Sequence, residues 1–173
     1  MTATTEFGLI EKYFTYESER DDVALGVGDD CALLNPPKDS QLAVTDDTLI
    51  SGVHFPESTS AEDIAFKSIA VSLSDLAAMG ATPAWATLAL TLTDVNELWL
   101  NEFSVSFKKK LETYGVQLIG GDTTQGQLSI TVQLIGFVEA GMAMRRDAAK
   151  PGDKIYVTGD LGDAALGLSL LGV

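Results

Sequence analysis

Acidic side chains follow short apolar segments at several separate points of this 173-residue chain. We interpret the apolar segments as strands, which places the carboxylates at strand ends. The stretch 44–55 shows the pattern most fully, because Asp46 and Asp47 end its strand-like half. It closes on His54, the only histidine in the chain. The fold is therefore expected to bring distant acidic points together, and the others are Asp29, Asp30, Asp75 and Asp122.

A convergent group of carboxylates requires a counter-charge. Two carboxylates about 4 Å apart repel each other by roughly 4 kcal/mol at an effective dielectric constant of about 20. Divalent cations remove that repulsion, and hard oxygen ligands favour Mg²⁺ or Ca²⁺. Because Mg²⁺ prefers few carboxylates together with substrate phosphates, a nucleoside triphosphate is the expected third component. Taken singly, each aspartate also suits a helix cap or a turn.

Asp75 differs from the other aspartates in its surroundings. It is the only acidic residue between Asp63 and Asp94, within a segment that indicates a largely buried helix. A lone charge in such a helix is costly unless it is paired or bound to a cation. We therefore expect Asp75 to be paired with another group or bound to a cation.

The overall charge excludes some classes of partner. The formal net charge is −14, with 25 acidic residues against 11 basic ones, which argues against nucleic acid and anionic membrane as partners. An anionic substrate remains compatible with this charge, because bound cations reverse the local sign.

One cysteine, Cys31, allows no internal disulfide, and the first residues lack the features of a signal peptide. The sequence thus predicts a cytoplasmic protein without a membrane span.

Apolar periodicity and capping signals predict an alternation of helices and strands. Ser60 and Asp94 begin capping boxes before the second and third helices. Helices are expected at residues 6–16, 61–79, 97–114 and 164–171, and strands at 23–27, 41–45, 84–92, 116–119, 127–139 and 154–158.

The end of the chain indicates a second domain. Residues 161–173 are almost wholly apolar, and a helix of that composition needs a partner surface. Pro151-Gly152 is the expected hinge. We therefore predict an ATP- and Mg²⁺-binding, dimerising N-terminal domain over 1–149 and the start of a truncated C-terminal domain over 150–173.

Other catalytic motifs are absent from the sequence. There is no P-loop, no Gly-x-Ser-x-Gly elbow and no Cys/His cluster for zinc. Gly26-Val27-Gly28 begins like a dinucleotide fingerprint, but Cys31 replaces its third glycine. Three features keep two interpretations each. Gly120-Gly121 allows either a close approach of the backbone to a phosphate or a tight turn. Arg145-Arg146 allows either a phosphate contact or a surface pair. His54 allows either a substrate contact or a structural role.

Taken in order, the motifs resemble those of thiamine-monophosphate kinases, over about residues 7–168. That family belongs to a superfamily with aminoimidazole ribonucleotide synthetase, selenophosphate synthetase and hydrogenase-maturation proteins. The set is specific as a whole, although no single motif is. It comprises Gly28-Asp29-Asp30, residues 45–49 with Gly52-Val53-His54-Phe55, residues 74–83, Gly120-Gly121-Asp122-Thr123, and Lys150-Pro151-Gly152-Asp153.

The resemblance implies ATP-dependent phosphorylation of thiamine monophosphate to thiamine diphosphate, by direct transfer with several Mg²⁺ ions. It implies no catalytic residue that forms a phosphoenzyme. By motif, ATP contacts fall on Gly121, Asp122 and Arg146, and a substrate contact falls on His54. The matching metal positions are Asp30, Thr45, Asp46, Asp47, Asp75 and Asp122.

The resemblance also implies a fold and an assembly. The fold is α/β, with a mixed, mainly antiparallel four-stranded sheet and helices on one face, and two such sheets pair into a barrel across a homodimer. Family members are about twice as long, so we expect this chain alone to be inactive. Asp46 and Ser72 depart from the family pattern, which more often has Ser or Thr at the first position and Asn at the second.

Two alternatives stay open at this point. One is a related ATP-using enzyme of the same superfamily with another substrate, similar to aminoimidazole ribonucleotide synthetase. The other is a non-catalytic dimerisation module in which the aspartates hold Ca²⁺ without ATP.

Overall fold

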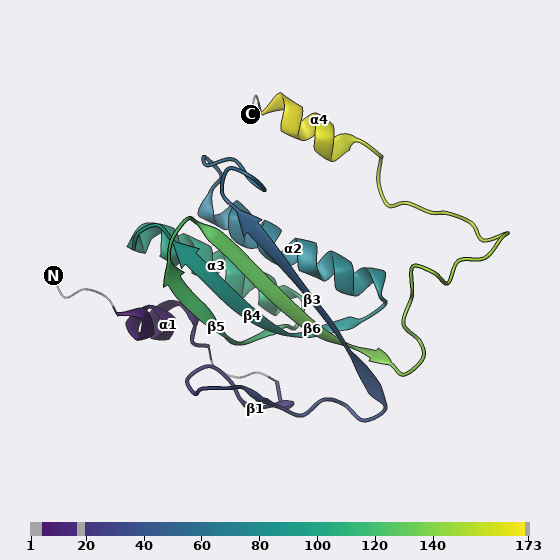
Figure 1. Ribbon diagram of the computed structural model, residues 1–173, viewed down its shortest axis with the longest axis horizontal. Helices are drawn as coiled ribbons and strands as arrows, with labels where there is room; N and C mark the ends of the chain where they lie inside the picture. Colours follow the sequence, from purple (N-terminus) through teal and green to yellow (C-terminus); the bar gives the residue numbers. More distant parts are fainter. Residues whose placement is uncertain (1–4, 17–19, 172–173) are drawn as a thin grey trace.

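A computed structural model describes residues 5–16 and 20–171 of the chain (Figure 1). Helices and strands alternate along most of the described part, as the periodicity predicts. In chain order they are α1 (Glu6–Phe14), β1 (Val23–Leu25), β2 (Leu33–Leu34), β3 (Ser40–Ile50), α2 (Ala61–Ala78), β4 (Thr82–Leu92), α3 (Glu97–Thr113), β5 (Gln117–Gln125), β6 (Ser129–Glu139) and α4 (Asp163–Leu170).

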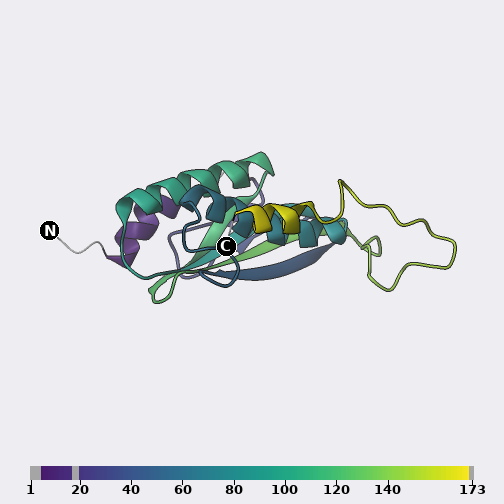
Figure 2. The ribbon, with the colours of Figure 1, turned by 90° about the horizontal axis from the view of Figure 1, so that it is seen from above.

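Four strands form the central sheet in the order β3-β6-β4-β5. β6 runs antiparallel to both β3 and β4, whereas β4 and β5 are parallel. Helices α2 and α3 cover one face of this sheet (Figure 2). The predicted mixed, mainly antiparallel four-stranded sheet with helices on one face is therefore confirmed.

The two faces of the sheet follow from strand alternation. Along β6, Ile130, Val132 and Leu134 are fully buried and point toward the helices. Phe103 and Phe107 of α3 complete this core from the other side. The residues between them on β6 lie on the opposite face, which we call the open face.

A smaller cluster covers one end of the open face. Trp85 of β4 stacks edge-on against Phe137 of β6, with ring centroids 4.9 Å apart. Val23 of β1 and Ile119 pack on the same cluster. Asp22 accepts a hydrogen bond from the Trp85 indole N–H at 3.1 Å, which ties the β1–β2 hairpin to the sheet.

Helix ends follow the capping signals in part. Ser60 caps α2 by accepting a hydrogen bond from the Asp63 amide, as predicted. At α3 the cap is Asn96, whose side chain accepts from the Trp99 amide, so the assignment of the cap to Asp94 was wrong. Both residues are good caps, and Asn96 directly precedes the first helical residue.

Strand lengths differ from the sequence prediction at three places. β3 continues to Ile50, so Asp46 and Asp47 lie within a strand rather than at its end. β5 likewise extends through Asp122 to Gln125. The predicted strand at 154–158 is irregular chain.

Residues 144–171 are exposed, and α4 stands apart from the sheet (Figure 1). Within the described ranges, no helix combines the length and apolar character that crossing a membrane requires.

Candidate functional site

The contact between edge strand β3 and helix α2 carries half of the predicted metal ligands. Thr45 Oγ1 donates to the Asp75 carboxylate at 2.8 Å. One turn earlier on the helix, Ser72 Oγ lies 3.3 Å from the Asp47 carboxylate and 3.1 Å from the Val132 carbonyl oxygen. We call this contact the β3–α2 seam. It brings Thr45, Asp47 and Asp75 to one line of hydroxyl and carboxylate oxygens.

Strand alternation explains this selection. Thr45 and Asp47 are two residues apart, so both point to the helix-covered face, whereas Asp46 points to the open face. Asp75 itself is exposed on α2, which corrects the expectation of a carboxylate enclosed in a buried helix. Its charge is tolerated because water reaches it and because Thr45 donates to it.

Arginine lies at one end of the seam. A hollow of about 520 Å³ is lined by Thr45, Asp75 and the two neighbouring arginines. The Arg145 guanidinium is held by Asp147 through two hydrogen bonds of 2.9 and 2.8 Å. Within the described ranges, the Arg146 side chain has no such partner, so its planar donors remain available to an anion.

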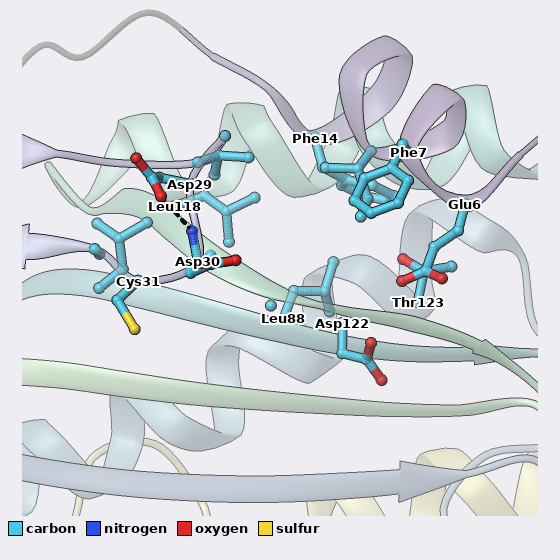
Figure 3. A pocket seen from close by; sticks show the side chains of 17 residues that line it. Glu6, Phe7, Phe14, Asp29, Asp30, Cys31, Leu88, Leu118, Asp122 and Thr123 are labelled. Atoms are coloured by element: carbon cyan, nitrogen blue, oxygen red, sulfur yellow. Dashed lines mark hydrogen bonds between the residues drawn. The ribbon is translucent and has the colours of Figure 1, made fainter.

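Asp30 and Asp122 lie in a different hollow, of about 430 Å³, between α1, residues 27–32 and β5 (Figure 3). The Asp30 amide donates to the Asp29 carboxylate at 2.7 Å, which shapes the turn. Apolar side chains form much of the wall, among them Phe7, Phe14, Leu88 and Leu118. The site therefore offers carboxylates beside a surface that suits a flat apolar group.

The two groups of acidic residues do not meet within one chain. Asp46 lies on β3 and Asp122 on β5, which are the opposite edges of the sheet. Three strand spacings of about 4.8 Å separate them by roughly 14 Å. Within the described residues, no three His, Cys, Asp or Glu side chains gather as a metal site. The expectation of one pocket for all six metal positions is thus corrected to two groups, one at each edge of the sheet. The β3 edge carries Thr45, Asp46, Asp47 and Asp75, and the β5 edge carries Asp30 and Asp122.

Gly121 serves the packing of the sheet. A Cβ at this position would lie 1.9 Å from the Leu88 carbonyl oxygen, and φ is +154°. Beside it, the pairing of β4 with β5 shifts register between Ala86 and Thr87. Glycine is required because the neighbouring strand comes so close. Neither interpretation made from the sequence, a phosphate contact or a tight turn, includes this packing role.

His54 follows β3 in a short turn. The Ile50 amide donates to His54 Nδ1 at 3.0 Å, and the His54 amide donates to the Ile50 carbonyl at 2.9 Å. The Lys67 ammonium donates to the His54 carbonyl oxygen. Sequence reasoning missed this lysine, although it is the only Lys or Arg between Lys38 and Lys108.

Comparison with known proteins places the chain in a family. Residues 28–138 match the model of "AIR synthase related protein, N-terminal domain". The matched range includes both acidic groups and leaves out Arg146. The chain belongs to the AIR synthase related family. Within it, the chain is 57% identical to the thiamine-monophosphate kinase of Escherichia coli K12 over 170 residues, which cover 98% of the chain and 52% of that protein. The corresponding Bacillus subtilis protein is 38% identical, with 96% and 52% covered.

Solved structures of similar fold include thiamine-monophosphate kinases. A thiamine-monophosphate kinase from Stenotrophomonas maltophilia superimposes with a TM-score of 0.84 at 55% identity, covering 89% of this chain and 49% of that one. A structure described as AaThiL complexed with AMPPCP and TMP gives 0.73 at 35% identity, covering 79% and 44%. A hydrogenase-maturation protein with ATP, at 22% identity and a TM-score of 0.66, shares the fold. The chain spans about half the length of the curated relatives it matches.

Proposed function

We propose that this chain is the N-terminal part of a thiamine-monophosphate kinase, which transfers the γ-phosphate of ATP to thiamine monophosphate. The observation that carries the proposal is the Thr45–Asp75 contact in the β3–α2 seam, with Asp47 beside it and Arg146 at its end. The identity to thiamine-monophosphate kinases supports the choice of substrate, as does the likeness to AaThiL complexed with AMPPCP and TMP. The alternatives of another substrate or a non-catalytic module lack such support.

The donor atoms of the seam suit magnesium. They are carboxylate and hydroxyl oxygens, without histidine or thiol, and this is the ligand set that Mg²⁺ prefers. When bound, Mg²⁺ neutralises the charge of the phosphates. In this proposal Thr45, Asp47 and Asp75 hold metal from the seam, and Asp46, Asp30 and Asp122 hold it from the open face and the second hollow.

The remaining residues of the site bind and orient. Arg146 contacts the nucleotide phosphates as a fork of parallel donors. Asp122 and the Gly121 backbone contact ATP, and His54 contacts thiamine monophosphate. Transfer then depends on holding the two phosphates in line, which is positioning and electrostatic stabilisation without a covalent intermediate on the protein.

A homodimer would join the two acidic groups. Asp46 and Asp122 lie on the same open face but at opposite edges, so a second copy packed on this face could bring its Asp122 near Asp46 of the first. Leu42 and Val44 leave 51% and 56% of their surface exposed there, which is apolar area for such packing. We therefore propose that two sheets pair into a barrel, in a cytoplasmic dimer.

Thiamine diphosphate formation by the full-length protein tests the function. The expected result is product formation from ATP and thiamine monophosphate that stops when EDTA removes Mg²⁺. Asp75→Asn should lower the rate by about 100-fold or more, since a ligand of the metal that neutralises the phosphates is lost. Asp94→Asn, which changes an exposed aspartate outside both acidic groups, should leave the rate unchanged. Full activity of Asp75→Asn, or no product from the unaltered protein, would refute the proposal.

A further inference from the structure

The segment between β3 and α2 is a turn held by its own backbone. The Gly52 amide donates to the Phe55 carbonyl at 2.9 Å, and the Val53 amide donates to the Ile50 carbonyl at 3.1 Å. Gly52 has φ +76°, and Phe55 is buried with 5% of its surface exposed. These contacts leave the His54 ring on the outside of a turn whose base is anchored in the core.

The hydrogen bond to the ring fixes which nitrogen carries the proton. A backbone amide only donates, so His54 Nδ1, which accepts from Ile50 at 3.0 Å, bears no hydrogen. In the neutral imidazole the proton is then on Nε2. The exposed ring therefore presents an N–H donor, and its natural partner is an acceptor oxygen.

Lys67 connects this turn to the helix. Its ammonium donates to the His54 carbonyl oxygen across 13 residues of chain. Within the described ranges, Lys67 forms no salt bridge. The same helix carries Ser72 and Asp75, which reach Asp47 and Thr45 of β3. Lys67 thus places the His54 turn on the same rigid element as the predicted metal ligands.

The His54 turn and the predicted metal ligands are separated along α2. Lys67 and Asp75 are eight residues apart on α2, which is about 12 Å along the helix axis. An acceptor bound at His54 could therefore extend its phosphate toward the metal end of the seam.

We propose that Lys67 is a positioning residue, which holds the His54 turn so that Nε2–H donates to an acceptor oxygen of the phosphate-accepting substrate. This inference rests on the proposed function for the identity of that substrate. In this proposal, Lys67 itself touches neither ATP nor the metals.

Steady-state kinetics of the full-length protein separate positioning from general damage. Lys67→Met keeps the aliphatic stem and removes the donor, so the KM for thiamine monophosphate should rise about tenfold, the usual range for a lost charge-assisted hydrogen bond. The kcat and the KM for ATP should stay within about twofold of the unaltered protein. Lys67→Arg should restore the KM, and Lys109→Met, an exposed lysine of α3, should leave it unchanged.

The ring nitrogens of His54 provide a readout that needs no activity. In ¹⁵N-histidine-labelled full-length protein, the His54 signals are assigned by their loss in His54→Gln. They should show the Nε2-protonated form, and Lys67→Met should shift them toward a mixture of both tautomers, while Lys67→Arg should not.

Unchanged KM and unchanged His54 signals in Lys67→Met would overturn the inference. An equal loss of kcat and ATP affinity would overturn it too, because it would indicate a structural role. If the unaltered protein forms no thiamine diphosphate, the proposed function fails, and the tautomer signals alone decide the role of Lys67.

Discussion

Adjacent glycines in β5 differ in what surrounds them. A Cβ on Gly120 would meet no atom within 4 Å, whereas a Cβ on Gly121 would overlap the Leu88 backbone. The sequence shows the pair as equivalent, because the constraint comes from a strand about thirty residues earlier. Individual residues in this chain therefore have roles that only the packing of distant segments defines.

Gly121→Ala should destabilise the fold by about 3 kcal/mol, since the β4–β5 pairing must open to admit a methyl group. Denaturant-induced unfolding measures the loss. Gly120→Ala is the matched control and should change stability little. Equal stability of the two variants would show that the close approach to Leu88 does not exist in solution.

Asp22 should give the stability a pH dependence. Its ion pair with Arg20, at 2.6 Å, holds the pKa of the Asp22 carboxyl below its ordinary value, with a smaller contribution from the Trp85 N–H. A lowered folded pKa means that this stability is present above the unfolded pKa of about 3.9 and is lost as the pH falls through the folded value. Unfolding free energies measured from about pH 5 down to pH 3 should fall more steeply for the unaltered protein than for Asp22→Asn. If the free energies of unfolding of the two proteins fell equally with pH, Asp22 would not be the source of this pH dependence.

At the scale of elements, the β3–α2 seam explains which motif residues come together. Helix α2 was predictable from its capping box and apolar composition. The motifs singled out Thr45, Asp47 and Asp75, which the seam brings together and whose metal-binding role stays a prediction. The full length of β3 was not predictable, because Asp46 and Asp47 are poor strand formers. The pairing of β3 with β6 overrides that preference. The face on which each aspartate lies follows from that length, so sequence alone could not separate Asp46 from Asp47.

Ser60→Ala should weaken α2 at its first turn. The Ser60 hydroxyl accepts from the Asp63 amide at 3.1 Å and donates to the Asp63 carboxylate at 2.8 Å. Loss of this cap should cost about 1 kcal/mol in thermal or denaturant unfolding. Ser58→Ala, in the exposed turn just before the helix, should have no measurable effect. The assignment of the cap fails if both variants match the unaltered protein.

At the scale of the molecule, the central sheet has one face covered by helices and one face largely open. The order of helices and strands was predictable, but the separation of the acidic groups was not, because strand order is set by long-range pairing. The prediction of one pocket assumed that strand ends meet. In the structure the strands that carry Asp46 and Asp122 are the two edges, so a second copy is the simplest source of proximity.

Val44→Lys should therefore weaken dimer formation. It places a charge on the apolar part of the open face, where desolvation on pairing would be costly. Sedimentation of the full-length protein should show a dimer that dissociates in this variant. Leu98→Lys, on the exposed side of α3, should remain dimeric. A monomeric unaltered protein, or identical behaviour of both variants, would contradict the proposed barrel.

In the proposed dimer, the acidic groups of two copies act at one metal–phosphate site. A purified heterodimer of full-length chains tests this arrangement, with one chain carrying Asp75→Asn and the other Asp122→Asn. Each parent homodimer should be inactive, and the heterodimer should regain about half of the unaltered activity, because one of its two sites is then intact. A heterodimer as inactive as its parents would show that Asp75 and Asp122 do not act across the two copies, which contradicts the proposed shared site.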